Sequence, residues 1–565
     1  MTRIPRPGGD ARALLFLAAL VAAATLPFLG HAYHIDETLF LRIARQVKQA
    51  PLDPYGFDYL WNLDYEPMHE LAAFPPLMPY YLAAVTPGLD AVPELVTQLA
   101  VLPFAFLAAF AVYALLRLQG FSVGWSAAGT GLFVVSPAFV LAANLAMPDM
   151  AAVALAVAGM ALTVASARRA SSAGLGVAGL LLGLSTLMRY NTLPLVPLLF
   201  LMAVSETSWR RALVPSLAAL VPVSCWLALS ARREGGPHAV ETLAIFASLS
   251  GMLSRTWALG THLTLSTYLP FVAALAFRPR SAVRVLLVLF LVLDVTVWFG
   301  ARGAILQFAA FPDALFFGAG LCAVLALAAG AARDLAAAGI LRWPPDGAGL
   351  QSEGFRRVVL FAWAAAALAV PLVYVHVASK YLLLAQPPLI VLLLLRLRDH
   401  GPRLRPRAVA FALTAAFAVS LLVAASDFEQ AGCYRTQAAR VLREVSGYAS
   451  TTGGRAGRIW FLGHWGFQYY MEGIGALPLP VKPQALEVAA GDWVIVPRYC
   501  SVHLLPEGLV PRLEKIAENE CPSCLPIRTM SHAARAGFYS NYWGPLPYTF
   551  STLPLEDFVT YRAVY

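Results

Sequence analysis

Charged residues are scarce in this chain. Only 13% of its 565 residues are Asp, Glu, Lys or Arg, whereas 59% are hydrophobic, and an average soluble domain has roughly 25% charged residues. This shortage excludes an ordinary soluble domain and predicts a polytopic membrane protein. The sequence also lacks a GxxxxGK[ST] loop, so it offers no recognisable cradle for nucleotide phosphates.

Long apolar runs, by contrast, are abundant. Runs of about 17 to 25 residues indicate transmembrane helices. The run 192–205 is short and carries Pro194 and Pro197, and losing it would invert the topology downstream. The first run follows three arginines, so a cleaved signal peptide is the alternative there. The sequence predicts about 13 spans, near residues 13–29, 94–116, 121–143, 148–166, 173–188, 192–205, 212–230, 257–277, 282–299, 304–330, 358–375, 378–395 and 408–425.

The distribution of basic residues predicts the orientation of these spans. With a cytoplasmic N-terminus, the inner segments hold twenty Lys and Arg residues and the outer loops hold nine, as the positive-inside rule requires. We therefore expect a multi-pass protein of a bacterial-type inner membrane, with a membrane domain over 1–426 and a periplasmic or extracellular domain over 427–565. The net charge of +9 then reflects topology and gives no reason to infer nucleic-acid binding.

Cysteine is also rare, and four of the six cysteines fall in the predicted outer domain: Cys433, Cys500, Cys521 and Cys524. An oxidising compartment permits disulfides there. The pair Cys521 and Cys524 could form a redox motif or half of a zinc site. We favour a structural bridge from Cys500 to Cys521 or Cys524.

Two adjacent carboxylates, Asp36 and Glu37, stand where the chain leaves the first apolar run. Apolar residues then recur at helical spacing as far as Val47, with basic residues between them, which predicts an amphipathic helix on the membrane surface. Asp36 either caps this helix or serves chemistry at the water boundary.

The rest of this outer loop, residues 31–93, is long and rich in aromatic residues, and long ordered loops tend to be functional. It contains His69 and Tyr80 as candidate substrate-binding residues. Asp64 and Glu66, two positions apart, form a candidate pair for a divalent metal, although most such pairs are merely solvated. No other cofactor is assigned.

Polar residues from distant parts of the sequence are expected at the same outer face. Asp149 opens the fourth span, as an N-cap or as a second acid facing Asp36, while Arg189, Lys380 and Tyr381 interrupt apolar sequence. Ionisable groups near hydrocarbon are functional candidates by default, and snorkelling to the interface is the alternative for the two cations. Such cations would hold a lipid phosphate while a carboxylate takes a proton from an attacking hydroxyl or amine. A sugar donor used here would be lipid-linked rather than nucleotide-linked.

Five segments, in this order, resemble the membrane-integral GT-C glycosyltransferases of the protein O-mannosyltransferase and aminoarabinose transferase type. They are DETLFLRIARQV after the first span, FPPLMPYYLA before the second, MPDM opening the fourth, GLLLGLSTLMRYN at 179–191 and SKYLLLAQPPLIVLLL at 379–394. The resemblance covers about residues 10–425. It implies a hexosyl- or pentosyltransferase that moves a sugar from a polyprenyl phosphate, with inversion, to a lipid, glycan or protein acceptor on the outer face.

The resemblance also implies roles for individual residues. Asp36 matches the family's proposed catalytic base, with Glu37 beside it, Asp149 matches the acid that opens the fourth span, and Tyr381 matches the tyrosine of a late (R/K)Y motif. Family members often carry Lys or His where this chain has Phe74, so phosphate binding would fall to Lys380, Arg189 or His69. The oligosaccharyltransferase signature WWDxG is absent, which argues against transfer of a preassembled glycan to asparagine.

The predicted outer domain has an α/β pattern, with strands over 458–465 and 492–498 and a helix over 466–476. Its aromatic stretches, 463–473 and 537–548, either stack on sugar rings or form the core of a small domain. Two other functions compete with sugar transfer. A transporter or flippase of lipid-linked sugars would also place charges near the membrane, although no internal repeat is evident, and a membrane-anchored receptor fits the many spans poorly.

Overall fold

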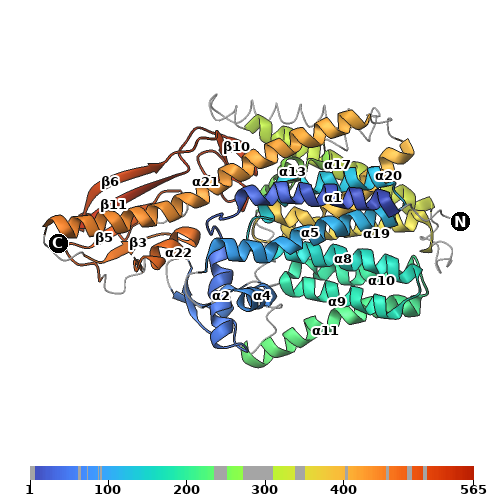
Figure 1. Cartoon of the computed structure of the whole chain (residues 1–565), viewed down its shortest axis with the longest axis horizontal. Helices are drawn as coiled ribbons and strands as arrows, with labels where there is room; N and C mark the ends of the chain where they lie inside the picture. The colour runs from blue at the N-terminus through green and yellow to red at the C-terminus, as the bar shows by residue number, and fades with distance from the viewer. Residues whose placement is uncertain are drawn as a thin grey trace.

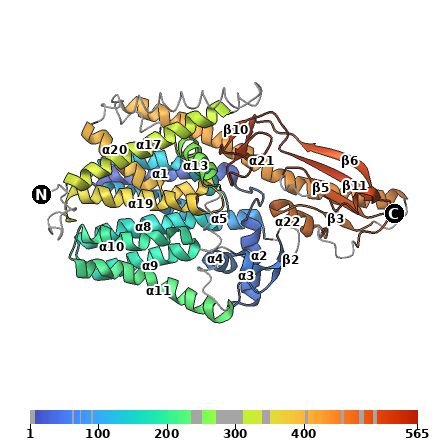
Figure 2. The same ribbon diagram turned by 180° about the vertical axis from the view of Figure 1, so that it is seen from behind.

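The chain forms a helical bundle and a smaller domain that contains β-strands, at opposite ends of the long axis (Figures 1 and 2). The computed structural model describes residues 7–61, 65–72, 74–86, 88, 92–234, 251–270, 310–337, 350–400, 405–452, 457–479, 487–499 and 505–564. The N-terminus lies at the bundle end and the C-terminus at the far end of the small domain (Figure 1). The predicted fold class, a polytopic helical membrane protein with a C-terminal α/β domain, is confirmed.

Six described helices are long and apolar enough to cross a membrane. Of these six, α8 is by far the most buried, because it packs against α5, α9 and α10. Their bounds are α1 (Pro7–Thr25), α5 (Glu94–Leu118), α8 (Pro148–Arg168), α11 (Trp209–Glu234), α19 (Glu353–Val373) and α21 (Pro406–Thr452).

Several of the other predicted spans appear as shorter or interrupted helices. Ser136 and Pro137 break the run 121–143 into two helices, and the proline-containing run 192–205 forms a 3₁₀ turn, η2 (Tyr190–Leu195), followed by α10. The run 282–299 lies outside the described residues, so the count of 13 spans stays a prediction. The remaining helices of this part of the chain are α6 (Val123–Val134), α7 (Pro137–Ala142), α9 (Ser172–Met188), α10 (Val196–Val204), α13 (Met252–Thr267), α17 (Ala310–Ala337) and α20 (Gln386–His400).

Small residues set the packing distance between α9 and α11. A Cβ atom at Gly179 would collide with the carbonyl of Pro215, and one at Gly183 would collide with the carbonyl of Ala219. Glycines four positions apart let two membrane helices approach closely. The predicted spans 173–188 and 212–230 therefore pack directly against each other.

The outer loop packs between the bundle and the small domain. The predicted amphipathic helix is α2 (Glu37–Gln49), whose apolar side is buried. A hairpin of β1 (Asp58–Leu60) and β2 (Tyr65–Pro67) follows, and then two helices, α3 (Met68–Leu71) and α4 (Leu77–Val85). Phe74 packs on Phe40 with 4.8 Å between the ring centroids.

The C-terminal domain is built on a five-stranded sheet with the order β4-β3-β5-β11-β6. The predicted strands and helix are confirmed as β3 (Ile459–Phe461), β5 (Trp493–Pro497) and α22 (Trp465–Gly473). Strand β3 runs parallel to β4 and β5, and β11 runs antiparallel to β5 and β6. The other strands are β4 (Leu477–Pro478), β6 (Leu513–Cys521), β7 (Ile527–Arg528), β8 (Met530–Ser531), β9 (Ala536–Gly537), β10 (Thr549–Phe550) and β11 (Glu556–Ala563).

Helix α21 connects the two parts without a break, and the predicted domain boundary at residue 427 lies inside it. A disulfide between Cys433 of this helix and Cys521 at the end of β6 ties the helix to the sheet. The expected bridge from Cys500 to Cys521 is therefore wrong, because Cys521 is already paired. Cys524 is free and exposed, and Cys500 lies outside the described residues.

Candidate active site

Asp36 stands at the N-cap position of α2, yet its side chain makes no capping hydrogen bond. Ile35, just before it, has a φ of 49°, which is unusual for a β-branched residue and marks a backbone held in place by its surroundings. The tight turn directs the Asp36 carboxylate away from the helix terminus. The capping explanation of Asp36 thus lacks the contact on which it depends.

The carboxylate of Asp36 instead faces Lys380, which lies in the 3₁₀ turn η3 (Ser379–Leu384) before α20. The Lys380 Nζ lies 3.4 Å from Asp36 Oδ2 and 3.4 Å from Met147 Sδ. Only 4% of the Lys380 side chain is exposed, compared with 33% of the Asp36 side chain. An ammonium group has three donors, and among the described residues Asp36 supplies the one carboxylate within ion-pair distance of it.

A second acid–cation pair lies beside the first. Arg189 follows α9, and its Nη1 donates to Asp149 Oδ2 over 3.2 Å, while its Nε lies 3.2 Å from Asp149 Oδ1 without hydrogen-bond geometry. The ring of Tyr381 links both pairs, because the Arg189 guanidinium carbon lies 4.9 Å and the Lys380 Nζ 5.9 Å from its centroid. The structure thus brings together Asp36, Asp149, Arg189, Lys380 and Tyr381.

His376 extends this cluster, although the sequence analysis did not select it as a site residue. Its Nε2 lies 3.1 Å from the hydroxyl of Tyr381. Burial, together with the nearby charges of Lys380 and Arg189, lowers the pKa of His376 to about 3. The imidazole is therefore neutral at ordinary pH and shares a hydrogen bond with the Tyr381 hydroxyl.

Glu37 occupies a different environment from its neighbour. Its side chain is buried, Oε2 accepts a hydrogen bond from the backbone N–H of His34 (2.8 Å) and Oε1 accepts one from that of Ala146 (2.6 Å). Burial raises the pKa of Glu37 to about 7. These bonds join the turn before α2 to the turn before α8, so Glu37 fixes the spacing between Asp36 and Asp149.

The C-terminal domain contributes to the site through a loop at 538–541. The backbone N–H of Asn541 donates to the carbonyl of Val377 (2.9 Å), and its side-chain oxygen accepts from the N–H of Val377 (2.7 Å). The N–H of Ser379 donates to the carbonyl of Phe538 (2.9 Å). The segment that carries Lys380 is thus clamped by the small domain.

A buried network also ties the start of the outer loop to α21. His31 Nε2 lies 3.3 Å from Asp427 Oδ2, and the hydroxyls of Thr529 and Tyr539 donate to the same carboxylate over 2.9 and 2.6 Å. The two ring nitrogens of the neighbouring His34 have no hydrogen-bond partner within the described residues. His31 and Asp427 are 396 positions apart, so no local pattern could have revealed their contact.

Other predicted site residues lie apart from the cluster. The hydroxyl of Tyr80 donates to the carbonyl of Pro51, and His69 is about half exposed with its Nε2 3.9 Å from Glu70. Glu66 lies on β2, and Asp64 lies outside the described residues. Within the described parts of the chain, no three His, Cys, Asp or Glu side chains gather to hold a metal ion.

Most aromatic residues of the two C-terminal segments are buried or partly buried in a hydrophobic cluster that the C-terminal domain shares with the outer loop and the bundle. Phe467, Phe538 and Trp543 are buried in one cluster that spans α22 and the loop after β9. Tyr542 is the exception, with 63% of its surface exposed, and its hydroxyl donates to the carbonyl of Val375 over 3.1 Å. This arrangement favours the core interpretation over a sugar-stacking surface.

No family model matches the sequence, and no curated protein matches it. Solved structures of GT-C glycosyltransferases, the class that the sequence motifs resemble, are similar in fold. ArnT from Cupriavidus metallidurans in the apo state is 14% identical over 97% of each chain, with a TM-score of 0.40. ArnT bound to undecaprenyl phosphate is 14% identical over 89% of this chain and 95% of that chain, with a TM-score of 0.43.

An oligosaccharyltransferase from Archaeoglobus fulgidus in the apo form is 13% identical over 83% of this chain and 64% of that chain, with a TM-score of 0.42. At these identities the likeness concerns the fold alone. The role of each residue must therefore come from the contacts of this chain.

Proposed function

We propose that this protein is an inverting glycosyltransferase that moves a sugar from a polyprenyl phosphate to an acceptor on the outer face of the membrane. The observation that carries the proposal is the meeting of Lys380 with Asp36 beside Arg189 with Asp149. Two cations and a partly exposed carboxylate provide what such a reaction needs. The order of the five sequence motifs supports the same assignment.

In this proposal Asp36 is the general base. Its carboxylate takes a proton from the acceptor hydroxyl or amine as that group attacks the anomeric carbon. The bond between this carbon and the phosphate oxygen breaks, and its electron pair leaves with the polyprenyl phosphate. Attack from the side opposite the leaving group inverts the anomeric centre, and no acid is needed because the phosphate is already a good anion.

Lys380 and Arg189 would bind the donor phosphate, since charge-assisted contacts of Lys and Arg with phosphate are strong. The donor phosphate then replaces Asp36 as the partner of the buried ammonium, which frees the carboxylate for the acceptor. Asp149 holds Arg189, and Glu37 holds the two acid-bearing turns together. The proposal thus gives the two adjacent carboxylates different roles.

The test is a transfer assay with the purified chain in lipid nanodiscs. Candidate polyprenyl-phosphate sugars would be supplied with extracted envelope lipids, glycans and proteins, and mass spectrometry would follow the loss of the donor and the gain of one sugar on an acceptor. Transfer that needs the protein supports the proposal. Movement of intact donor across the bilayer without transfer would instead favour a flippase.

A further inference from the structure

A small hollow lies at the end of the helical bundle remote from the C-terminal domain. Its volume is about 130 Å³, and it opens between the last turns of α5 and α8 and the neighbouring ends of α19 and α20. Four arginines line it, Arg168, Arg356, Arg357 and Arg398, with Glu353 as the one acidic lining residue. The proposed catalytic residues lie at the other end of the same helices.

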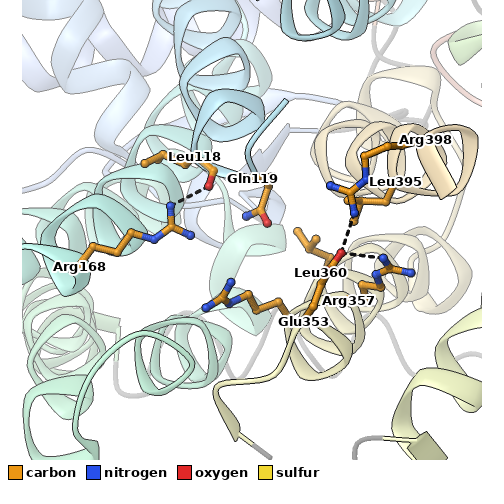
Figure 3. A pocket seen from close by; sticks show the side chains of 9 residues that line it. Leu118, Gln119, Arg168, Glu353, Arg357, Leu360, Leu395 and Arg398 are labelled. Carbon is orange, nitrogen blue, oxygen red and sulfur yellow. Dashed lines mark hydrogen bonds and ion pairs between the residues drawn. The ribbon is translucent and has the colours of Figure 1, made fainter. Parts of the chain in front are cut away.

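Carboxylates hold these arginines in fixed positions. Glu353 Oε1 accepts hydrogen bonds from Nη2 of Arg357 and Nη2 of Arg398, both over 2.7 Å (Figure 3). Asp399 accepts from the same two residues over 2.6 and 2.9 Å. Across the hollow, Glu206 accepts two bonds from Arg168 over 3.0 and 2.7 Å. The guanidinium groups are therefore preorganised.

The carboxylates do not use up the positive charge. Four arginines face three acids, Glu206, Glu353 and Asp399, which leaves one positive charge in excess. Arg356 Nε lies 3.2 Å from Glu206 Oε1 without hydrogen-bond geometry. The buried Nε atoms of Arg356 and Arg357 have no acceptor within the described residues, and a buried donor without an acceptor destabilises a fold. The two Nε atoms themselves have almost no accessible surface, but the Arg356 and Arg357 side chains line the hollow and are 33% and 21% exposed, so a ligand would reach other parts of them.

We propose that this hollow binds the phosphate of an anionic phospholipid headgroup. Guanidinium groups match the oxygen geometry of a phosphate, and basic pockets between membrane helices bind acidic headgroups. Leu118, Leu360 and Leu395 also line the hollow, which suits a lipid rather than a free phosphate ion. The site is independent of the proposed sugar transfer.

A closed network of ion pairs that merely braces four helices is the competing explanation. The two explanations differ at Glu353. Replacing Glu353 with Gln removes an anion from the lining, so a lipid site should keep or increase its affinity for an anionic headgroup. If the ion pairs only brace the helices, Glu353→Gln should lower the stability of the protein without improving lipid binding. Arg356→Gln removes a donor that has one ion-pair partner, so it should weaken lipid binding with little loss of bracing.

The experiment uses the full chain purified in detergent, with phosphatidylglycerol, phosphatidylcholine or inorganic phosphate added at equal concentration. Native mass spectrometry counts retained lipid, and thermal unfolding measures stabilisation. We expect phosphatidylglycerol alone to be retained and to raise the melting temperature. Arg356→Gln should lower its affinity roughly tenfold, as the loss of a charge-assisted bond implies. Arg440→Gln, an exposed arginine paired with Glu444 on α21, is the control and should bind like the parent.

Three results would overturn the proposal. Equal effects of phosphatidylglycerol and phosphatidylcholine would mean that the headgroup charge is not recognised. Equal protection by inorganic phosphate would assign the site to a free anion. Weaker lipid binding after Glu353→Gln, as large as that after Arg356→Gln, would leave only the bracing role. If Arg356→Gln does not fold, the Glu353→Gln comparison with the three additives still decides the matter.

Discussion

Lys380 and Asp36 are 344 positions apart in the sequence, yet the ammonium nitrogen of one lies 3.4 Å from a carboxylate oxygen of the other. The two partners differ in their access to water, because the ammonium is buried and a third of the Asp36 side chain is exposed. An acceptor arriving from water would therefore meet the carboxylate first.

We expect Asp36→Asn to reduce sugar transfer by roughly 10²-fold or more, the usual scale for general base catalysis. The change keeps the size of the side chain and removes no capping bond. It also leaves the Lys380 ammonium without its carboxylate, so donor binding should stay equal or become tighter. Transfer rates and donor affinity would be measured on the same preparation. Near-normal transfer would exclude Asp36 as the base.

Glu37→Gln should change how stability depends on pH. The pKa of Glu37 is raised from 4.5 to about 7 by burial, so the folded state binds the proton more tightly than the unfolded state. The stabilisation from this group is complete below about pH 4.5 and is lost as pH rises through about 7. The Glu37→Gln variant has no ionisable group at this position, so its stability does not fall in this way as pH rises. Its melting temperature relative to the parent should thus be higher at about pH 8 than at about pH 5.

His34, in the same turn as Glu37, also contributes a pH dependence to the stability. Burial lowers the pKa of His34 to about 4, so its effect on stability has the opposite sign, and it is present in both proteins. It therefore cancels in the difference between them. A difference in melting temperature that does not vary with pH would show that Glu37 stays ionised in the fold.

Lys380→Ala and Arg189→Ala should each weaken donor binding by roughly ten- to a hundredfold, because each loses a charge-assisted contact worth about 1.5–3 kcal/mol. Titration of the purified variants with a fluorescent polyprenyl phosphate would give the affinities. Lys515→Ala, an exposed lysine on β6 paired with Glu518, is the matched control. Parent-like affinity in both site variants would leave the cations as interface anchors.

Loss of the disulfide should destabilise the C-terminal domain. Cys433 and Cys521 are 88 positions apart, and removing a native bridge typically costs about 2–5 kcal/mol. We expect Cys433→Ser to lower the melting temperature, and added reductant to lower that of the parent but not that of this variant. Cys524→Ser should behave like the parent, since Cys524 is free. Peptide mapping without reductant would identify the pair directly.

A reporter fused after Tyr565 should be active only in the outer compartment. This follows from the excess of basic residues in the predicted inner segments. Two reporters would be fused at this position in separate experiments. One is active only outside the cytoplasm and the other only inside it, so they should give opposite signals. Cytoplasmic activity would mean that the number of spans is even, with the interrupted run at 192–205 as the first place to look.

The sequence predicted those features that depend on local patterns. Alternating and helical periodicity located β3, β5 and α22, and the amphipathic pattern located α2. Arg189 and Lys380 were selected because they interrupt apolar sequence, and an ionisable side chain beside hydrocarbon is costly unless it has a function. These signals depend on residues within one or two turns of each other.

Features that depend on contacts between distant segments could not be read in the same way. Asp36 and Glu37 are neighbours with the same chemistry, and only the tertiary fold shows that one faces Lys380 while the other accepts two backbone hydrogen bonds. Likewise, cysteine spacing favoured a partner near Cys521, whereas α21 brings Cys433 to it. His69 and Tyr80 share the outer loop with Asp36 but lie apart from its cluster.

Helix α21 has 47 residues in one uninterrupted run, which corresponds to a rod about 70 Å long. Its first half runs along the outside of the bundle (Figure 1), and its second half carries the disulfide to the sheet. A continuous helix cannot act as a hinge, so the small domain cannot move relative to the membrane without also moving or bending α21 against the bundle. The helix thereby couples the position of the small domain to that of the bundle helices that it contacts.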